Sequence, residues 1–270
     1  MTLAMTKQND AWSAQFESVG LDELNSNASL QTRVDRKYVI TQSTFEALVP
    51  RIAPLARVLE IGGQRQLGYW STYYDTPDLS SYLDAVHKRP SRWKVRTRTY
   101  LDSDLHFIEV KTRSRRGRTV KTRQLAEVAD HQQLAPASQL FVAATLSDRL
   151  GITVGEGGRT VALLQPTLTT EYARVTLLVE SDTSRATVDT ALAVSLTDGT
   201  QRRLDDHVII ETKTSGRASP VDRVLWDSGI RPASISKFGA GLALLQPSLP
   251  AAKWNRVLRN DFGWTPAPAA

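Results

Sequence analysis

The chain has 270 residues, 41% hydrophobic and 23% charged, which is ordinary for a globular protein that buries a substantial core. It contains no cysteine, which excludes disulfides, thiolate metal sites and cysteine nucleophiles and fits a reducing compartment. Residues 1–15 lack the apolar core of a signal peptide, and no stretch approaches the ~20 apolar residues of a membrane helix. We therefore expect a soluble cytoplasmic protein.

The formal charge of +6 is concentrated in one segment. Between residues 88 and 123 there are thirteen lysines and arginines against three acids, a local net charge of +10. The rest of the chain is therefore net acidic. A local excess of this kind indicates an anionic ligand rather than general surface charge.

The first half of the chain alternates strand-like runs with short helical segments. Ser43 is a typical N-cap residue and stands before the helical pattern of residues 44–51. Residues 102–104 form a turn between two strand-like runs, which predicts a β-hairpin. The elements expected up to residue 123 are helices at 10–18, 44–51 and 79–86 and strands at 33–40, 68–74, 92–101, 105–113 and 119–123.

The second half runs from a helical stretch through further strands into a helical tail. Residues 139–150 carry apolar side chains at helical spacing and end at Gly151, a typical C-terminal stop. Pro220 stands at the first position of another helical segment, where proline is favoured. The elements expected in this half are helices at 139–150, 220–228, 236–245 and 252–260 and strands at 168–180, 185–189, 193–196 and 207–213.

Charged residues two positions apart recur inside these strands, and they decide the expected fold. A strand repeats every two residues, so both members of such a pair point to the same face of a sheet. Burying them in a dry core would cost several kcal/mol per ion, whereas a closed sheet with a wet lumen removes most of that cost. We therefore predict an α+β fold, an eight-stranded antiparallel β-barrel packed by helices.

The clearest charged face belongs to the strand at 92–101. Lys94, Arg96 and Arg98 alternate there with Trp93, Val95 and Thr97. Arginine offers a planar fork that binds two phosphate oxygens. A hairpin with one solvated face is the alternative. On the next strand Glu109 and Lys111 share a face, where a cross-strand ion pair is the alternative.

Glu211 and Lys213 emerge from a strongly apolar strand near the end of the chain. A divalent cation that bridges protein and phosphate needs such a carboxylate, so Glu211 is the candidate metal ligand. A structural ion pair is the alternative. In the strand at 168–180, Tyr172 and Arg174 share a face, and Arg174 could equally be held in a salt bridge.

Several common catalytic motifs are missing from the sequence. It has no P-loop, no dinucleotide-binding glycine turn, no HExxH and no GxSxG, and its four histidines are scattered. Aromatic residues are not interleaved regularly with the basic ones, which argues against a specific nucleic-acid partner.

Six short motifs occur in order along the chain: Arg33–Tyr38, Ser71–Thr76, Lys94–Arg98, Glu109–Lys111, Glu211–Lys213 and Ser236–Phe238. Together they resemble the polyphosphate polymerase (VTC) domain, a branch of the CYTH-like triphosphate tunnel metalloenzymes. The resemblance spans roughly residues 30–246 and implies an eight-stranded tunnel with inward charges. We expect an N-terminal helical or flexible segment at 1–30, a tunnel domain at 31–250 and a C-terminal helix and tail at 251–270.

The resemblance also implies roles for individual residues. Glu211 would hold the divalent metal, Mn²⁺ or Mg²⁺. The family usually has Glu where this chain has Asp35, and the shorter side chain leaves Asp35 a secondary site residue. The implied catalytic residues are Lys37, Arg96, Arg98, Lys111, Arg174, Arg185, Lys213 and Lys237, and the implied substrate-binding residues are Asp35, Glu109, Lys121, Tyr172 and Ser236.

The function that this resemblance implies is ATP- and metal-dependent polyphosphate synthesis. The γ-phosphate of ATP would pass to a growing polyphosphate chain inside a basic tunnel. ATP and inorganic polyphosphate are therefore the expected partners. A membrane protein as a further partner is compatible with this function. One alternative is an inorganic or nucleoside triphosphatase on the same scaffold. Another is a non-catalytic binder of polyphosphate or nucleic acid.

Overall fold

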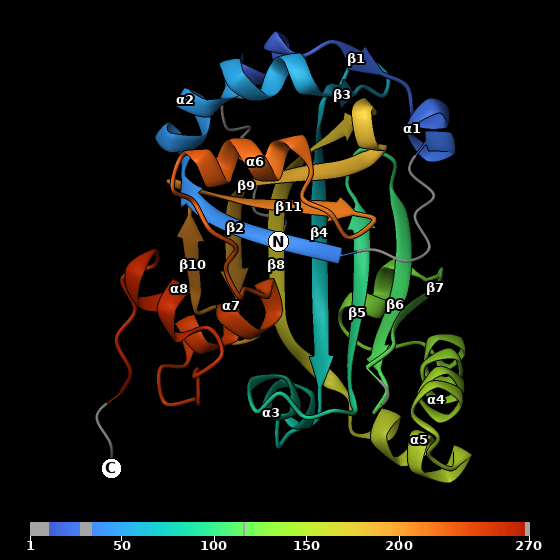
Figure 1. Ribbon diagram of the computed structural model, residues 1–270. Helices are drawn as coiled ribbons and strands as arrows, with labels where there is room; N and C mark the ends of the chain where they lie inside the picture. The colour runs from blue at the N-terminus through green and yellow to red at the C-terminus, as the bar shows by residue number, and fades with distance from the viewer. Residues whose placement is uncertain (1–10, 28–33, 116, 268–270) are drawn as a thin grey trace. The chain divides into compact units, whose positions relative to one another are not determined.

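The computed structural model describes residues 11–27, 34–115 and 117–267 (Figure 1). Within them the chain is α+β, with eight α-helices and a large, mostly antiparallel sheet. It divides into two compact units. Unit 1 comprises Met1–Gly68, Tyr172–Ala193 and Arg203–Ser234, and unit 2 comprises Tyr69–Glu171, Val194–Arg202 and Ile235–Ala270.

Unit 1 is built on strands from both ends of the sequence. A short 3-10 helix, Ala11–Gln15, lies where a helix at 10–18 was predicted, and Asp10 falls outside the described residues. The elements of this unit are α1 (Leu21–Asn27), α2 (Gln42–Ile52), α6 (Pro220–Asp227), β1 (Ser18–Val19), β2 (Val34–Thr41), β3 (Arg57–Leu59) and β11 (His207–Thr214).

The sequence prediction for the start of α2 was wrong by two residues. Thr41, not Ser43, caps the helix, and its hydroxyl accepts the backbone N–H of Thr44 at 3.2 Å. Thr41 ends β2 in an extended conformation, which is the backbone geometry that an N-cap requires. The helix therefore begins directly where the strand ends.

The sheet of unit 1 has one apolar face and one charged face. Tyr38 of β2 and Ile210 of β11 pack in one core with Phe45 of α2 and Leu225 of α6, and all four are almost fully buried. Because side chains alternate along a strand, the intervening residues of β2 and β11 point to the other face. The charged residues singled out from the sequence lie at these intervening positions.

Unit 2 contains the predicted β-hairpin and most of the helices. The hairpin forms as β5 (Arg92–Tyr100) and β6 (Leu105–Arg113), so this prediction is confirmed. Gly151, with φ 68°, ends α4 (Pro136–Leu150), also as predicted. The other elements of the unit are α3 (Ser80–Val86), α5 (Val154–Ala162), α7 (Lys237–Leu245), α8 (Asn255–Asn260) and β7 (Thr119–Leu125).

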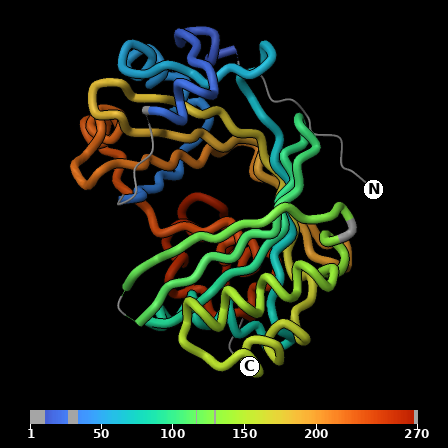
Figure 2. The backbone as a smooth tube through the Cα atoms, turned by 90° about the vertical axis from the view of Figure 1, so that its right-hand side faces the viewer, coloured from blue at the N-terminus to red at the C-terminus, as the bar shows by residue number. Residues whose placement is uncertain are grey.

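Helices α4 and α5 cover one face of the hairpin. Figure 2 shows the green strands of unit 2 lying across these yellow-green helices. Val95 and Val110 of the hairpin form a core with Val142 and Leu146 of α4 and Val161 of α5. The opposite face of the hairpin carries the alternating cations.

Four strands run through both units: β4 (Gln66–Asp75), β8 (Gln165–Val179), β9 (Ser184–Ser195) and β10 (Gln201–Leu204). The strands predicted at 185–189 and 193–196 are one strand, β9, in which Ala191 has φ 51°. The main hydrogen-bonded path has eight strands in the order β2-β11-β9-β8-β4-β5-β6-β7. Its ends are β2 and β7, so closure into a barrel stays a prediction.

The predicted domain limits at residues 30 and 250 also stay a prediction. Residues 1–10 and 28–33 lie outside the described part of the chain. Among the residues that the structure describes, no helix is long and apolar enough to cross a membrane.

Candidate functional site

In unit 1, a carboxylate on β11 lies among three cations. The register of β2 and β11 places Lys37 directly opposite Glu211, and the Lys37 Nζ is 3.1 Å from the Glu211 Oε1. Lys213, two residues along the same strand, approaches that oxygen to 3.4 Å. Arg174 of β8 is near enough to act on the Glu211 charge. We call Lys37, Arg174, Glu211 and Lys213 the Glu211 cluster.

The cations of this cluster outweigh the effect of burial on its carboxylate. Burial alone would raise the pKa of Glu211, but the charges of Lys213, Lys37 and Arg174 hold that pKa well below its usual value. Glu211 is therefore ionised. For Lys213 burial dominates and lowers its pKa to about 8, with Glu211 acting in the opposite direction.

A second acid fixes the arginine of the Glu211 cluster. The Arg174 guanidinium donates to both carboxylate oxygens of Asp189 at 2.6 and 2.8 Å, and Asp189 is only 1% exposed. The guanidinium carbon also lies 5.3 Å from the ring centre of Tyr172. Arg174 is thus held in one orientation by a two-point ion pair and an aromatic face.

Asp35 and Arg185 both stand opposite Lys213, one on each neighbouring strand. The charge of Asp35 raises the pKa of Lys213 and so favours its protonated form. Arg185 donates from Nη2 to the carbonyl of Leu24 at 3.2 Å. Both residues are therefore placed beside the Glu211 cluster by strand register.

Unit 2 contains a comparable arrangement around Glu109 of β6, which is 2% exposed. Arg96 Nε donates to Glu109 Oε2 at 2.7 Å, and Lys121 Nζ donates to Oε1 at 2.8 Å. Burial opposes ionisation, yet Arg96, Arg98 and Lys121 together lower the pKa of Glu109 below its usual value. We call Arg96, Arg98, Glu109 and Lys121 the Glu109 cluster.

Aromatic residues hold the two arginines of the Glu109 cluster. Arg96 Nη1 donates to the Tyr73 hydroxyl at 3.0 Å, and Tyr73 stacks on Phe238 with ring centres 5.0 Å apart. The Arg98 guanidinium lies 5.3 Å from the ring centre of Tyr69. Sequence reasoning missed both tyrosines as site residues. The signal was present, because Tyr69, Ser71 and Tyr73 alternate along β4.

Three lysines of unit 2 lie side by side, one on each of three neighbouring strands. Lys94 of β5, Lys111 of β6 and Lys121 of β7 are direct Cα partners. Direct partners in an antiparallel pair share a face, and like charges placed opposite one another are destabilising. We call these residues the lysine row. Such a row is stabilised by an anion that binds across it.

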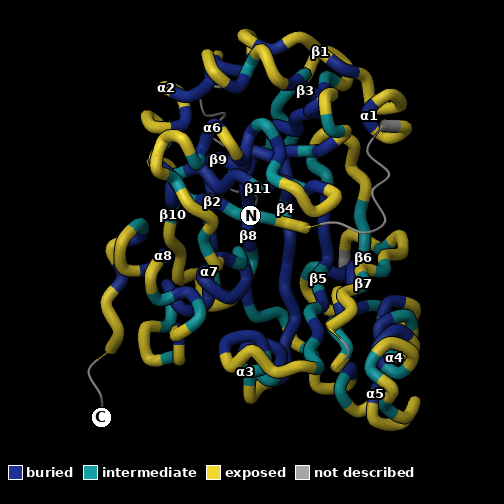
Figure 3. Tube along the Cα trace, in the orientation of Figure 1, coloured by how far each residue is buried: buried dark blue, intermediate teal, exposed yellow. Residues whose placement is uncertain are grey.

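One end of the lysine row meets the first turn of α7. The Lys94 Nζ donates to the Ser236 hydroxyl at 2.7 Å, and that hydroxyl also accepts the N–H of Gly239 at 3.3 Å. Ser236 is therefore the N-cap, and α7 begins at Lys237, one residue after the predicted start at 236. Figure 3 shows α7 as largely buried.

The carboxylates of the two clusters, Glu211 and Glu109, fit a divalent ion shared with a substrate better than a metal held by protein alone. Among the described residues, no group of three or more His, Cys, Asp and Glu side chains could hold a metal. Mg²⁺ and related ions are commonly bound by one or two carboxylates plus substrate phosphates. Glu211 is ionised and its side chain is 17% exposed, so it fits that role. Both oxygens of Glu109 are already bound by cations.

Comparison with known proteins identifies the family of this chain. The VTC domain family matches residues 32–246. The chain belongs to the VTC domain family. A search of the curated proteins found no match for this VTC domain.

Three solved structures are similar to this VTC domain. A proposed adenylate cyclase from Bacillus halodurans shares 14% identity, with a TM-score of 0.45 over 76% of this chain and 94% of that one. A proposed adenylyl cyclase from Hippeastrum with a dominant triphosphatase activity shares 13%, with a score of 0.46 over 77% and 94%. A Pyrococcus horikoshii protein shares 14%, with a score of 0.42 over 77% and 95%. Likeness at this level carries no functional conclusion for the VTC domain.

The residues predicted for the site of this VTC domain fall into two sets. Those of unit 1 surround Glu211, and those of unit 2 surround Glu109 and the lysine row. Sequence reasoning omitted Lys94 and Asp189 from the site, although both lie within strands whose alternation it used. The first set is Asp35, Lys37, Tyr172, Arg174, Arg185, Glu211 and Lys213, and the second is Arg96, Arg98, Glu109, Lys111, Lys121, Ser236 and Lys237.

Proposed function

We propose that the protein is an ATP- and divalent-metal-dependent polyphosphate polymerase, which transfers the γ-phosphate of ATP to a growing polyphosphate chain. The observation that carries this proposal is the surplus of cations around the half-buried Glu211 and around the buried Glu109. Three cations lower the pKa of Glu211, and three different cations lower the pKa of Glu109. A polyphosphate or triphosphate would supply the missing negative charge. Membership of the VTC domain family supports the same substrate class.

The state of the carboxylates favours a phosphate acceptor over water. Glu109, Asp189 and Glu211 are all held in ion pairs with basic side chains. The lowered pKa values of Glu109 and Glu211 make both of them weak general bases. The end of a polyphosphate chain carries its own negative charge and needs no base, whereas water must be activated or positioned. A triphosphatase is therefore the second candidate.

The residues of the chain would act chiefly by positioning and charge stabilisation, which dominate phosphoryl transfer. Arg96 and Arg98, whose guanidinium groups rest against tyrosine rings, would orient phosphate oxygens in unit 2. Lys37 and Lys213 would do so in unit 1. Glu211 would hold the divalent ion, which when bound would neutralise charge on the transferring phosphoryl group.

The direct test is incubation of the purified protein with γ-labelled ATP and Mn²⁺, with and without a chelator. We expect labelled polymer that disappears when the metal is removed. Release of labelled phosphate without polymer would favour the triphosphatase. Binding of polyphosphate without either product would leave a non-catalytic binder.

The pKa of Lys213 predicts how binding depends on pH. With a pKa of about 8, the protonated fraction of Lys213 falls from about nine-tenths at pH 7 to about one-tenth at pH 9. The affinity for tripolyphosphate, measured by calorimetry, is therefore expected to fall roughly tenfold over this range. The charged groups that act on Lys213 are Glu211, Arg174, Asp35 and Lys37.

The matched control for this prediction is Lys213→Arg, because a guanidinium stays protonated throughout. Its affinity should not fall between pH 7 and pH 9, and an equal fall in both proteins would contradict the prediction. The titration of Lys213 is not expected to unfold the protein at high pH. Unfolded Lys213 holds its proton until about pH 10.5, so between pH 8 and 10.5 its contribution to the free energy of unfolding rises with pH.

A further inference from the structure

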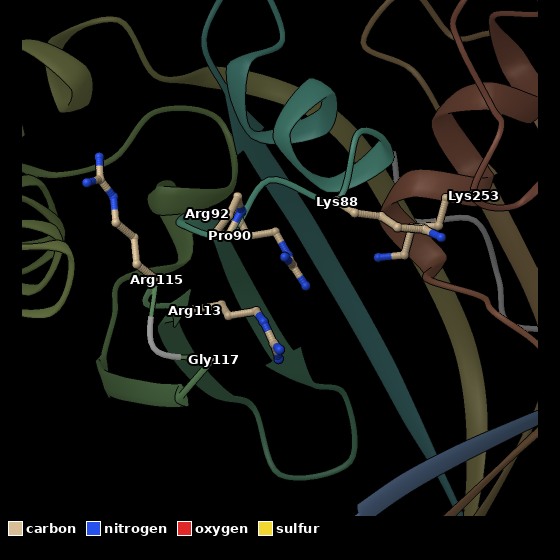
Figure 4. Close-up of a pocket in the computed structure, with 7 residues that line it drawn as sticks. All are labelled: Lys88, Pro90, Arg92, Arg113, Arg115, Gly117 and Lys253. Atoms are coloured by element: carbon tan, nitrogen blue, oxygen red, sulfur yellow. The ribbon is translucent and has the colours of Figure 1, made fainter.

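Unit 2 contains a basic cavity that none of the predicted site residues lines. Its volume is about 380 Å³, and its residues come from the loop before β5, the ends of β5 and β6, the turn after β6 and the loop before α8 (Figure 4). No acidic residue lines the described part of this cavity. The lining residues are Lys88, Pro90, Arg92, Arg113, Arg115, Gly117 and Lys253.

Four of the five lining cations, Lys88, Arg92, Arg113 and Lys253, converge on the cavity from different elements. Figure 4 shows Arg92 and Arg113 pointing to the same side, Lys88 and Lys253 close together, and Arg115 directed away from them. Arg92 Nη1 donates to the carbonyl of Arg89 at 2.5 Å, and Arg113 Nη1 donates to the Thr119 hydroxyl at 3.3 Å. Both acceptors are neutral, so the charges of these two arginines are oriented but not cancelled by these bonds.

Electrostatics within unit 2 agree with this crowding of positive charge. Burial lowers the pKa of Lys253, and the nearby charges of Arg92, Lys88 and Arg113 lower it further. Burial and Arg113 likewise lower the pKa of Arg92, while Asp84 acts in the opposite direction. Asp84 is thus a partial counter-charge for Arg92 outside the lining. An anion in the cavity would relieve the remaining repulsion.

The cavity continues the charged face of β5 and β6. Arg92 and Arg113 are direct Cα partners, two residues along the ladder from the pair formed by Lys94 and Lys111. Side chains two apart share a face, so this face passes from Arg98 through the lysine row to the cavity. Six residues of strand span roughly 20 Å. A ligand that follows this face along its whole length is therefore longer than a single triphosphate.

We propose that this cavity is a second anion site, which binds phosphate groups of a polyphosphate chain that extends past the lysine row. The proposal rests on the proposed function, because it takes polyphosphate as the ligand. Condensed phosphate suits the cavity better than nucleic acid does, since the described lining has no aromatic side chain on which a base could stack. The site makes binding depend on chain length.

The test compares two double variants with the same change in net charge. Lys88→Ala with Lys253→Ala removes two cations from the cavity, and Arg149→Ala with Arg159→Ala removes two exposed cations from α4 and α5. Binding of long-chain inorganic polyphosphate and of tripolyphosphate is measured without ATP at one salt concentration. The loss of two charge-assisted contacts should weaken binding of the long chain roughly tenfold or more and leave tripolyphosphate within about twofold. The control variant should bind both as the unaltered protein does.

Three results would overturn the proposal. They are unchanged affinity of the cavity variant for the long chain, an equal loss for tripolyphosphate, and a loss for a single-stranded oligonucleotide with polyphosphate affinity retained. Thermal melting checks that both variants are folded. Failure of the proposed function is a separate result, because it would appear as no labelled polymer from the unaltered protein with γ-labelled ATP.

Discussion

Replacing Glu211 with glutamine is expected to abolish metal-dependent turnover while polyanion binding persists. Glutamine keeps the shape of the side chain but loses the charge that a hard divalent ion requires. Removal of one electrostatic contributor at a reacting centre commonly costs about a hundredfold or more in rate. Lys37 and Lys213 remain beside the site, so its net charge becomes more positive. Labelled-ATP turnover and tripolyphosphate calorimetry measure the two effects.

The matched control for Glu211→Gln is Glu60→Gln in the same unit. Glu60 also pairs with a cation, since its Oε2 lies 2.7 Å from the Arg65 Nε, but no contact joins it to the Glu211 cluster in the described structure. We expect its turnover to match that of the unaltered protein. If the Glu211 variant retains turnover with the same metal requirement, Glu211 is not the metal ligand. Retained tripolyphosphate binding excludes unfolding as the cause of lost activity.

The parts of the fold that follow from local pattern could be predicted. The hairpin of β5 and β6 was predicted within a residue because cations alternate there with buried apolar side chains. Helix α5 was missed. Its sequence contains Gly155, Gly157 and Gly158, which weaken helix propensity, and its start depends on a capping box between Thr153 and Glu156.

The site could be predicted only where its residues share a strand. Glu211 and Lys213 lie two apart on β11, so their common face follows from sequence alone. Their partners depend on which strands pair and in which register, and no single sequence states this. The lysine row and the contact between Arg174 and Asp189 both depend on strand pairing and register. The basic cavity is harder still, because separate loops build it.

Replacing Glu109 with glutamine is expected to destabilise unit 2 and to make its stability depend on polyphosphate. Glu109 is almost fully buried and balances the charges of Arg96, Arg98 and Lys121. Breaking a buried ion pair typically costs about 3–5 kcal/mol in the free energy of unfolding. We expect about 3 kcal/mol, because the Arg96 and Lys121 side chains are 22% and 40% exposed and water solvates part of their charge.

Polyphosphate should then replace the lost carboxylate as the counter-charge. A ligand that binds only the folded state stabilises it, and the gain grows with affinity. The variant leaves Arg96 and Lys121 without their buried acid, so saturating polyphosphate should raise its melting temperature more than that of the unaltered protein. Glu127→Gln, an exposed change of equal charge in the same unit, should show neither the loss nor the larger gain. Equal gains in all three proteins would mean that polyphosphate does not bind at the Glu109 cluster.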